Sequence, residues 1–192
     1  MAKRPVFKVH DFVDIGSGNA GRAHILSMHH EGKSFVAVDK NGFNRRQVET
    51  DFRNAGRAVP KNLQMIKRDG LRYLKEQSAS SIRILNFDLS GATKKFIAEQ
   101  GAKSDYLLFN PAFFKEARRV LVPRGRIFIL TLGTEADSIT ASLRQAGFRT
   151  KQAVFSDLLN SGQVTSATQT IIRDIIDTHS AHNFVRIDAT KK

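Results

Sequence analysis

The sequence predicts an α/β domain in which helices cover both faces of a mostly parallel, doubly wound sheet. Two observations favour this fold class. Apolar runs of strand length alternate with amphipathic stretches of helix length five times along the chain. A glycine-rich turn, Gly16-Ser-Gly-Asn-Ala-Gly21, directly follows the first apolar run, Phe12–Ile15. Because 192 residues suffice for one large core, we expect one domain over 1–192, with a short basic arm at 1–10.

The first half of the chain contains three strand–helix units. The predicted strands are apolar runs at Asp11–Ile15, Ser34–Val38 and Asn62–Ile66. The predicted helices have apolar residues every three or four positions and cover Asn19–His30, Asn44–Gly56 and Leu71–Gln77. Glycines follow the first strand and aspartates follow the next two, as expected of a fold that binds a nucleotide-type cofactor.

The second half continues this alternation and then departs from it. A fourth strand begins at Ser81–Leu85, and a polar connection follows at 91–104. The remaining elements are a helix at Pro111–Leu121, a turn at Val122–Gly125, a strand at Arg126–Leu132 and a helix at Glu135–Ala146. Two further strands, Phe148–Phe155 and Asn183–Asp188, bring the sheet to seven. Residues 165–177 have helical spacing, and three roles stay open: a substrate cover, a dimer contact, or completion of the core.

The composition excludes several classes of function. The chain has no cysteine, which rules out disulfides, thiolate zinc sites and cysteine nucleophiles, and we predict no metal site. No apolar stretch approaches the roughly 20 residues of a membrane helix. The first residues carry charge without an apolar run behind them, so a secretory signal is not expected. We therefore expect a cytoplasmic protein without membrane association.

The charge balance favours a polyanionic partner. Lys and Arg number 31 and Asp and Glu number 18, which gives a formal net charge of +13. Such an excess suits RNA, because each neutralised phosphate releases counterions. The alternative is a solvated basic surface on a protein with a small-molecule substrate. We expect tRNA or rRNA as partner, and a monomer or homodimer.

The glycine-rich turn is compatible with two kinds of cofactor. Its G-x-G-x-x-G spacing fits a dinucleotide site, with Asp39 as the acid that binds a ribose. Asp14, two residues before Gly16, argues against a pyrophosphate and for a ligand with an ammonium group. Asp69, after the third strand, is placed to accept from an adenine amino group. The chain also lacks a second domain that would supply acid–base residues for hydride transfer.

These residues, in this order and spacing, resemble the class I S-adenosylmethionine-dependent methyltransferases along nearly the whole chain. The segment Val120–Arg126 also looks like that family's turn into its fifth strand. The resemblance implies a Rossmann-like fold, S-adenosylmethionine as cofactor, and methyl transfer as activity. It implies that Gly16 and Gly18 pass under the methionine part of the cofactor. The predicted cofactor-binding residues are Asp14, Gly16, Ser17, Gly18, Asp39, Lys40, Asp69 and Gly70.

The resemblance also gives the aspartates individual roles. Asp14 would lie near the ammonium group, Asp39 would hold both ribose hydroxyls, and Asp69 would face the adenine amine. Vicinal hydroxyls are both donors, so an acid at a strand end satisfies them with charge-assisted hydrogen bonds. The cofactor has no phosphate, and the loop carries no Lys or Arg before Arg22. For each aspartate the alternative is a helix N-cap or a turn residue.

The acceptor side of the reaction should lie just beyond the fourth strand, at Asn86-Phe87-Asp88. Methyl transfer is an in-line displacement that depends on positioning, with a general base where the acceptor loses a proton. Asp88 is the candidate for orienting or deprotonating the acceptor, and its alternative is a loop cap. Phe87 either stacks on a base or packs in the core. Asn86 is a candidate hydrogen-bond partner of the acceptor.

The central half is similar to the tRNA (guanine-N7)-methyltransferase family. The similarity covers Asn86-Phe87-Asp88, Lys94-Lys95, the segment Leu108–Phe114 and the strand Ile127–Thr131. It implies an RNA base as acceptor, with Lys94 and Lys95 contacting phosphate. Where that family has an acid after the threonine of its fifth strand, this chain has Leu132 after Thr131. A small-molecule or protein acceptor, and a non-catalytic RNA-binding module of the same fold, are the alternatives.

Overall fold

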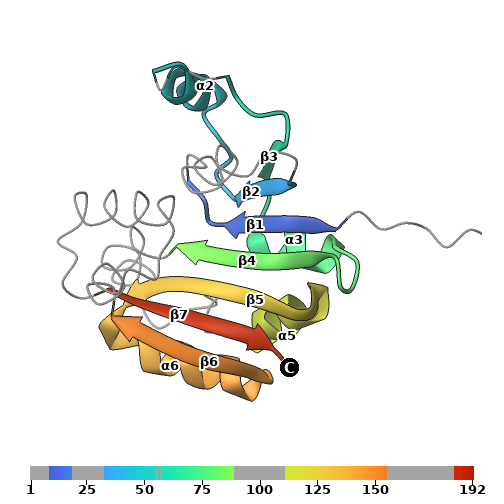
Figure 1. The fold of residues 1–192 in the computed structure, drawn as a ribbon, viewed down its shortest axis with the longest axis vertical. Coiled ribbons are helices and arrows are strands. Elements are labelled where there is room, and N and C mark those ends of the chain that lie inside the picture. Colours follow the sequence, from blue (N-terminus) through green and yellow to red (C-terminus); the bar gives the residue numbers. More distant parts are fainter. Residues whose placement is uncertain (1–8, 19–32, 55, 57, 89–110, 155–183) are drawn as a thin grey trace, which may run out of the picture.

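A computed structural model of the chain describes residues 9–18, 33–54, 56, 58–88, 111–154 and 184–192 (Figure 1). Seven strands form one sheet, and they are β1 His10–Ile15, β2 Phe35–Asp39, β3 Leu63–Lys67, β4 Ile82–Asp88, β5 Leu121–Leu132, β6 Phe148–Val154 and β7 Phe184–Lys191. The described helices are α2 Arg45–Asn54, α3 Gly70–Glu76, α5 Pro111–Val120 and α6 Gly133–Gln145. Within the described residues, every predicted strand and helix is confirmed, with ends shifted by a few residues.

The strand order is β3-β2-β1-β4-β5-β7-β6. The first five strands pair in parallel, and β7 runs antiparallel to both β5 and β6. The prediction of a mostly parallel, seven-stranded sheet is therefore confirmed. From β1 the chain continues outward to β2 and β3, and it then returns to the other side of β1 as β4. The carboxyl ends of β1 and β4 form the switch point at which doubly wound sheets bind ligands.

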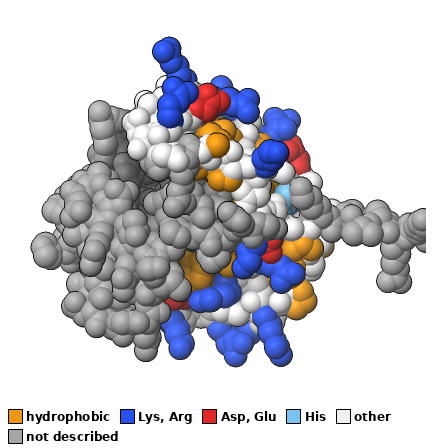
Figure 2. Space-filling model, turned by 45° about the horizontal axis from the view of Figure 1, so that its top comes forward, with side chains coloured by type: hydrophobic (Ala, Val, Ile, Leu, Met, Phe, Trp, Pro, Cys, Tyr) orange, Lys and Arg blue, Asp and Glu red, His pale blue; other side chains and the backbone are white. Residues whose placement is uncertain are grey.

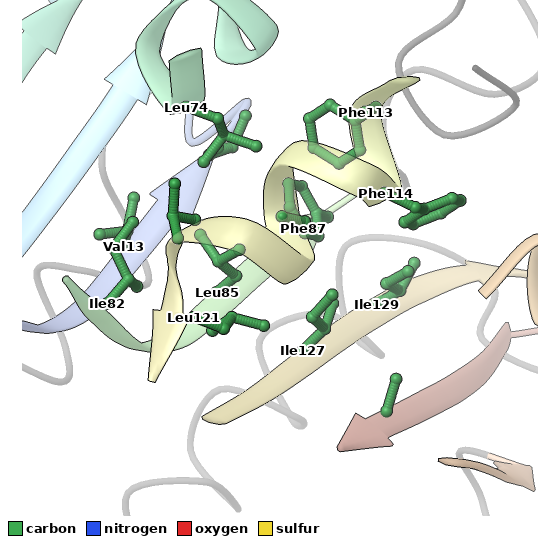
Figure 3. Packing of buried hydrophobic residues seen from close by; sticks show 14 of the residues in the cluster. Val13, Leu74, Ile82, Leu85, Phe87, Phe113, Phe114, Leu121, Ile127 and Ile129 are labelled. Carbon is green, nitrogen blue, oxygen red and sulfur yellow. The ribbon is translucent and has the colours of Figure 1, made fainter. Parts of the chain in front are cut away.

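Two apolar clusters lie on opposite faces of the sheet, because successive strand residues point to opposite sides. The larger cluster joins alternate residues of β1, β4 and β5, such as Val13, Leu85 and Ile127, to α3, α5 and α6. Figure 3 shows α5 lying across this part of the sheet. The smaller cluster packs α2 against the other face, where Phe12 and Phe52 are buried. Helices therefore cover both faces, as predicted.

The segment predicted as a turn, Val122–Gly125, is a bulge inside β5. Leu121 already pairs with Ile82 of β4, and pairing resumes at Arg126, opposite Ile84. Arg124 has a φ of 61°, and a Cβ on Gly125 would lie 2.8 Å from the carbonyl oxygen of Val122. The prediction of a turn before the strand is therefore wrong: the strand begins at Leu121, and the Pro-Arg-Gly sequence marks a bulge within it.

Helix α3, which begins at the ligand-binding edge, is anchored at its other end by Arg119 of α5. The guanidinium donates to the carbonyl oxygens of Leu74 and Gln77, each at 2.8 Å, and pairs with Glu116. The last carbonyls of a helix lack full partners within the helix. Arg119 gives a second donor to Leu74 O, which also accepts from Gln77 N, and a donor to the carbonyl of the C-cap, Gln77.

Several predictions concern residues outside the described part of the chain. They are most of the arm at 1–10, the helix at 19–30, the connection at 91–104 with Lys94 and Lys95, and the helix at 165–177. None of the helices in the described ranges is long and apolar enough to cross a membrane.

Candidate functional site

The candidate site lies at the carboxyl edge of β1, β2 and β4. The chain leaves β1 at Ile15 and folds over the end of β2, where Gly16 N and Ser17 N donate to the carbonyl oxygen of Val38 at 2.8 and 3.3 Å. These bonds fix the start of the glycine-rich turn against the neighbouring strand. The start of the turn is therefore held by backbone contacts to β2.

Gly16 and Gly18 adopt φ angles of 73° and 53°, a region in which residues other than glycine are strained. A Cβ at either position would meet no described atom within 4 Å. The glycines are thus required by backbone conformation, and none of the described residues fills the space that a side chain there would take. Ser17 Oγ is buried between them without a hydrogen-bond partner in the described structure. Such an orphaned hydroxyl is the kind of group that a bound ligand satisfies.

Asp39, the last residue of β2, faces this turn. Its Oδ2 accepts from Gly18 N at 3.0 Å and its Oδ1 accepts from Asn41 N at 2.8 Å, and the residue is only 9% exposed. The two amides fix the plane of the carboxylate. Each carboxylate oxygen has two acceptor sites, so both oxygens keep capacity for one further donor. Lys40 follows it as an exposed residue.

Asp14 and Asn86 form a buried pair between β1 and β4. They are register partners in the sheet, and Asn86 Nδ2 donates to Asp14 Oδ1 at 2.8 Å. Asp14 is 1% exposed and Asn86 is 8% exposed. A buried carboxylate requires hydrogen bonds or an opposite charge, and Asn86 supplies one of these bonds. The amide predicted to contact the acceptor thus also supports Asp14.

Asp69 is the N-cap of α3. Its Oδ1 accepts from Arg72 N at 2.9 Å, which is the capping alternative considered for this residue. Its Oδ2 forms no hydrogen bond with the described residues, and the side chain is exposed. Gly70 follows as the buried first residue of the helix. A contact between Asp69 and an adenine amine stays a prediction, compatible with the cap.

In the acceptor segment, Phe87 adopts the core-packing alternative of the two that were considered for it. The ring is 2% exposed and packs edge-on against Phe113 of α5, with 5.0 Å between ring centres (Figure 3). We therefore assign Phe87 to the core in place of base stacking, because its position in β4 turns it toward α5. Asp88 is the last residue of β4 and pairs with Leu130 of β5. Its proposed role is not decided by this pairing.

An acid that the sequence did not single out lies at the same edge, beyond β5. Glu135 accepts a hydrogen bond from the fully buried Thr131, with 3.2 Å between Oγ1 and Oε2. Burial raises the pKa of Glu135 above its ordinary value, and the Thr131 hydrogen bond partly opposes this rise. The available signal was an acid in the first turn of the helix after the fifth strand. Its contact with Thr131 depends on how that helix leaves the strand.

No family model matches this sequence, and no curated protein is similar to it. Many solved structures are similar in fold. For the 16S rRNA methyltransferase KamB, the TM-score is 0.60 at 13% identity over 97% of this chain and 89% of KamB. For geranyl diphosphate C-methyltransferase from Streptomyces coelicolor A3(2), the TM-score is 0.58 at 12% identity, over 96% of this chain and 73% of that protein. This chain has the class I methyltransferase fold.

At such identities the similarity establishes the methyltransferase fold alone. Phosphoethanolamine N-methyltransferase 2 from Haemonchus contortus has a similar fold, with a TM-score of 0.53 at 15% identity. The match includes 98% of this chain, which spans only 50% of that protein's length. That structure contains S-adenosylmethionine, and the Streptomyces structure contains S-adenosylhomocysteine. The acceptors named for these proteins differ, so the methyltransferase fold does not identify the acceptor here.

Proposed function

We propose that this chain is an S-adenosylmethionine-dependent methyltransferase that acts on a base of tRNA or rRNA. The observation that carries the proposed use of S-adenosylmethionine is the Asp39 carboxylate, which is buried at a strand end and oriented by two backbone amides. On this fold, such a group beside a glycine-rich turn suits a ligand with two vicinal hydroxyls. We propose one methyltransferase domain over 1–192, with the arm at 1–10.

The residues of the edge fit the proposed cofactor by the chemistry of their donors and acceptors. Asp39 keeps one acceptor site on each oxygen for the ribose hydroxyls. Asp14 supplies a buried negative charge, which favours an ammonium group. Ser17 Oγ supplies a hydroxyl without a partner in the described structure. We propose that the cofactor-binding residues are Asp14, Gly16, Ser17, Gly18, Asp39, Lys40, Asp69 and Gly70.

When bound, S-adenosylmethionine supplies an electrophilic methyl group on a sulfonium. The part of this chain is to place a nucleophilic acceptor atom in line with that methyl group, because such a displacement depends on positioning. We propose that Asp88 orients the acceptor and takes its proton where one must leave. Asn86 positions this segment through its bond to Asp14, in addition to any contact with the acceptor.

Charge supports RNA as the acceptor. The net charge of +13 favours a polyanion, and one protein of similar fold is named as a 16S rRNA methyltransferase. The resemblance of the central half to the tRNA (guanine-N7)-methyltransferases points in the same direction, with Lys94 and Lys95 as proposed phosphate contacts. A small-molecule acceptor is the second candidate, since other proteins of similar fold are named for geranyl diphosphate and phosphoethanolamine.

The test is transfer of a labelled methyl group from S-adenosylmethionine into separate pools of RNA, protein and small molecules. We expect label in RNA, abolished in Asp88→Ala and retained in Asp137→Ala, an exposed aspartate of α6. Label in the small-molecule or protein pool instead would contradict the RNA assignment. Cofactor binding without any transfer would leave the RNA-binding module as the better description.

A further inference from the structure

One face of the β5–β7–β6 part of the sheet gathers basic side chains around a phenylalanine. Side chains paired across a sheet point to the same face, so the strand registers define rows. The rows are Arg126–Thr190–Arg149, Phe128–Asp188–Lys151 and Leu130–Arg186–Ala153. The opposite face carries Ile127 and Ile129, buried beneath α5 and α6. We call Arg126, Phe128, Arg149, Lys151 and Arg186 the basic face.

The three rows contain four cations and one acid. Asp188 pairs with Arg186, with 2.7 Å between Oδ1 and Nε. Arg126, Arg149 and Lys151 are exposed, and none of them forms an ion pair within the described residues. In Figure 2, Lys and Arg side chains likewise predominate over Asp and Glu on the surface shown. The basic face therefore keeps an excess of positive charge at its centre and along its outer edge.

Phe128 holds two of these cations in place. The guanidinium carbons of Arg126 and Arg186 lie 4.6 and 4.7 Å from its ring centre. Contact with the ring lowers the side-chain entropy that each arginine would lose on binding an anion. Asp188 already pairs with Arg186, so Arg126 is the cation beside the ring that has no acid partner among the described residues. A guanidinium also matches the oxygens of a phosphate with paired hydrogen bonds.

Other arginines of the molecule contrast with this arrangement. The guanidinium of Arg119 pairs with Glu116 and donates to the carbonyls of Leu74 in α3 and of Gln77, the C-cap of α3. Arg144 donates to Thr150. The contact of Arg126 is with an aromatic ring, which leaves its donors directed to no described acceptor. The basic face is thus distinguished by Arg126, a guanidinium that an aromatic ring orders and that pairs with no acid among the described residues.

The basic face adjoins the candidate site through the sheet. Phe128 is the register partner of Asn86, which in turn bonds to Asp14. Leu130, in the row of Arg186, is the partner of Asp88. Neighbouring strands are separated by about 4.8 Å, so Arg186 lies two strand spacings, roughly 10 Å, from the end of β4. A polyanion on the basic face therefore passes close to the segment that we propose to receive the acceptor.

From these observations we propose that the basic face binds the phosphate backbone of the acceptor RNA and guides it to the end of β4. The proposal rests on the proposed function. Base recognition is assigned elsewhere, because phosphate contacts position a nucleic acid without reading its sequence.

The test compares two triple variants with equal loss of charge. Arg126→Gln/Arg149→Gln/Lys151→Gln removes three exposed cations from the basic face. Lys61→Gln/Lys75→Gln/Lys115→Gln removes three exposed lysines from the β3 edge and from the helices of the opposite face. Affinity for a fluorescein-labelled tRNA transcript is measured by anisotropy at a series of salt concentrations. Calorimetry with S-adenosylmethionine checks that both variants keep their cofactor site.

We expect the basic-face variant to lose about tenfold in affinity, and the slope of log affinity against log salt to shrink by about two. The control variant should change both quantities much less. Equal losses in the two variants would overturn the proposal, because overall charge would then explain the binding. Label transfer into RNA by the wild type, with equal activity in both variants, would overturn the proposal and leave the proposed function intact.

A second substitution tests the ring. Phe128→Leu keeps an apolar side chain but removes the surface on which both guanidiniums lie, so we expect a two- to fivefold loss of RNA affinity. Its thermal unfolding is compared with that of the wild type. Unchanged affinity in a folded Phe128→Leu protein would contradict the role of the ring in ordering the arginines.

Discussion

The glycine-rich turn with Asp39 and the acceptor segment of β4 lie at the same edge of the sheet, yet they use their side chains differently. Asp39 is held by backbone amides and keeps acceptor capacity for a ligand. In the acceptor segment, Asn86 bonds to Asp14 and Phe87 packs against Phe113, so both serve the protein itself. The donor side of the proposed reaction is therefore built in advance. The acceptor side depends on Asp88 and on groups from neighbouring strands.

Substitution of Phe87 should have the largest effect on the free energy of unfolding. If its ring is a core element, Phe87→Ala should lower the free energy of unfolding by about 3–5 kcal/mol, since it removes a buried aromatic ring and leaves a cavity. Phe87→Leu, which refills most of the volume, should cost less than about 1.5 kcal/mol. Urea unfolding followed by circular dichroism measures both. A small effect of Phe87→Ala would return the ring to the acceptor site and weaken the contrast between the two regions.

The Asp14–Asn86 bond joins the two regions and carries the next largest effect. Asn86→Ala removes the amide from a buried carboxylate, and we expect a loss of about 1.5–3 kcal/mol in the free energy of unfolding. Cofactor affinity should fall as well, because Asp14 loses the group that orients it. Calorimetry and urea unfolding give the two quantities. Asn86→Ala with full stability and normal cofactor affinity would show that the segments are independent.

Two substitutions of Asp69 distinguish its role as helix N-cap from a contact with the cofactor. Asp69→Ala should destabilise the protein by about 1 kcal/mol through loss of the N-cap, whereas Asp69→Ser retains the cap and most of the stability. If Asp69 also meets the adenine, both variants should bind the cofactor more weakly than the wild type. Cofactor affinity that is normal in Asp69→Ser would reduce Asp69 to a structural residue.

Substitution of Glu135 should have the smallest effect on stability, and this effect should depend on pH. Because burial raises the pKa of Glu135 in the folded state above its ordinary value, its ionisation favours the unfolded state. The stability associated with this group is present below the unfolded pKa and is lost as pH rises through the folded pKa. Glu135→Gln should therefore gain stability relative to the wild type between about pH 4 and pH 7. Unfolding midpoints at the two pH values measure the shift, and an opposite sign would contradict the burial of this acid.

Features encoded within a few residues of one another were predictable from the sequence. The positive φ angles of Gly16 and Gly18 and the place of Asp39 follow from a strand, a tight turn and the next strand end. The mostly parallel, doubly wound sheet follows from the alternation of strands and helices, because few topologies are allowed for that alternation.

Features that depend on register between distant segments were not predictable. The partnership of Asp14 with Asn86 joins residues 72 positions apart, and a shift by one residue in β4 would turn Asn86 to the other face. The same register decides that Phe87 points to α5. The bulge at Val122–Gly125 and the row that connects Phe128 with Asn86 likewise exist only once β4 and β5 are aligned.

The most direct test of the account is calorimetric titration of S-adenosylmethionine into the wild type, Asp39→Asn and the matched control Asp137→Asn. Asp39→Asn keeps the shape of the side chain but removes the charge that strengthens its bonds to ribose hydroxyls. We predict micromolar or tighter binding to the wild type and to Asp137→Asn, and a loss of about tenfold or more in Asp39→Asn. Equal affinity in all three proteins, or no binding to the wild type, would contradict the assignment of this edge as the cofactor site.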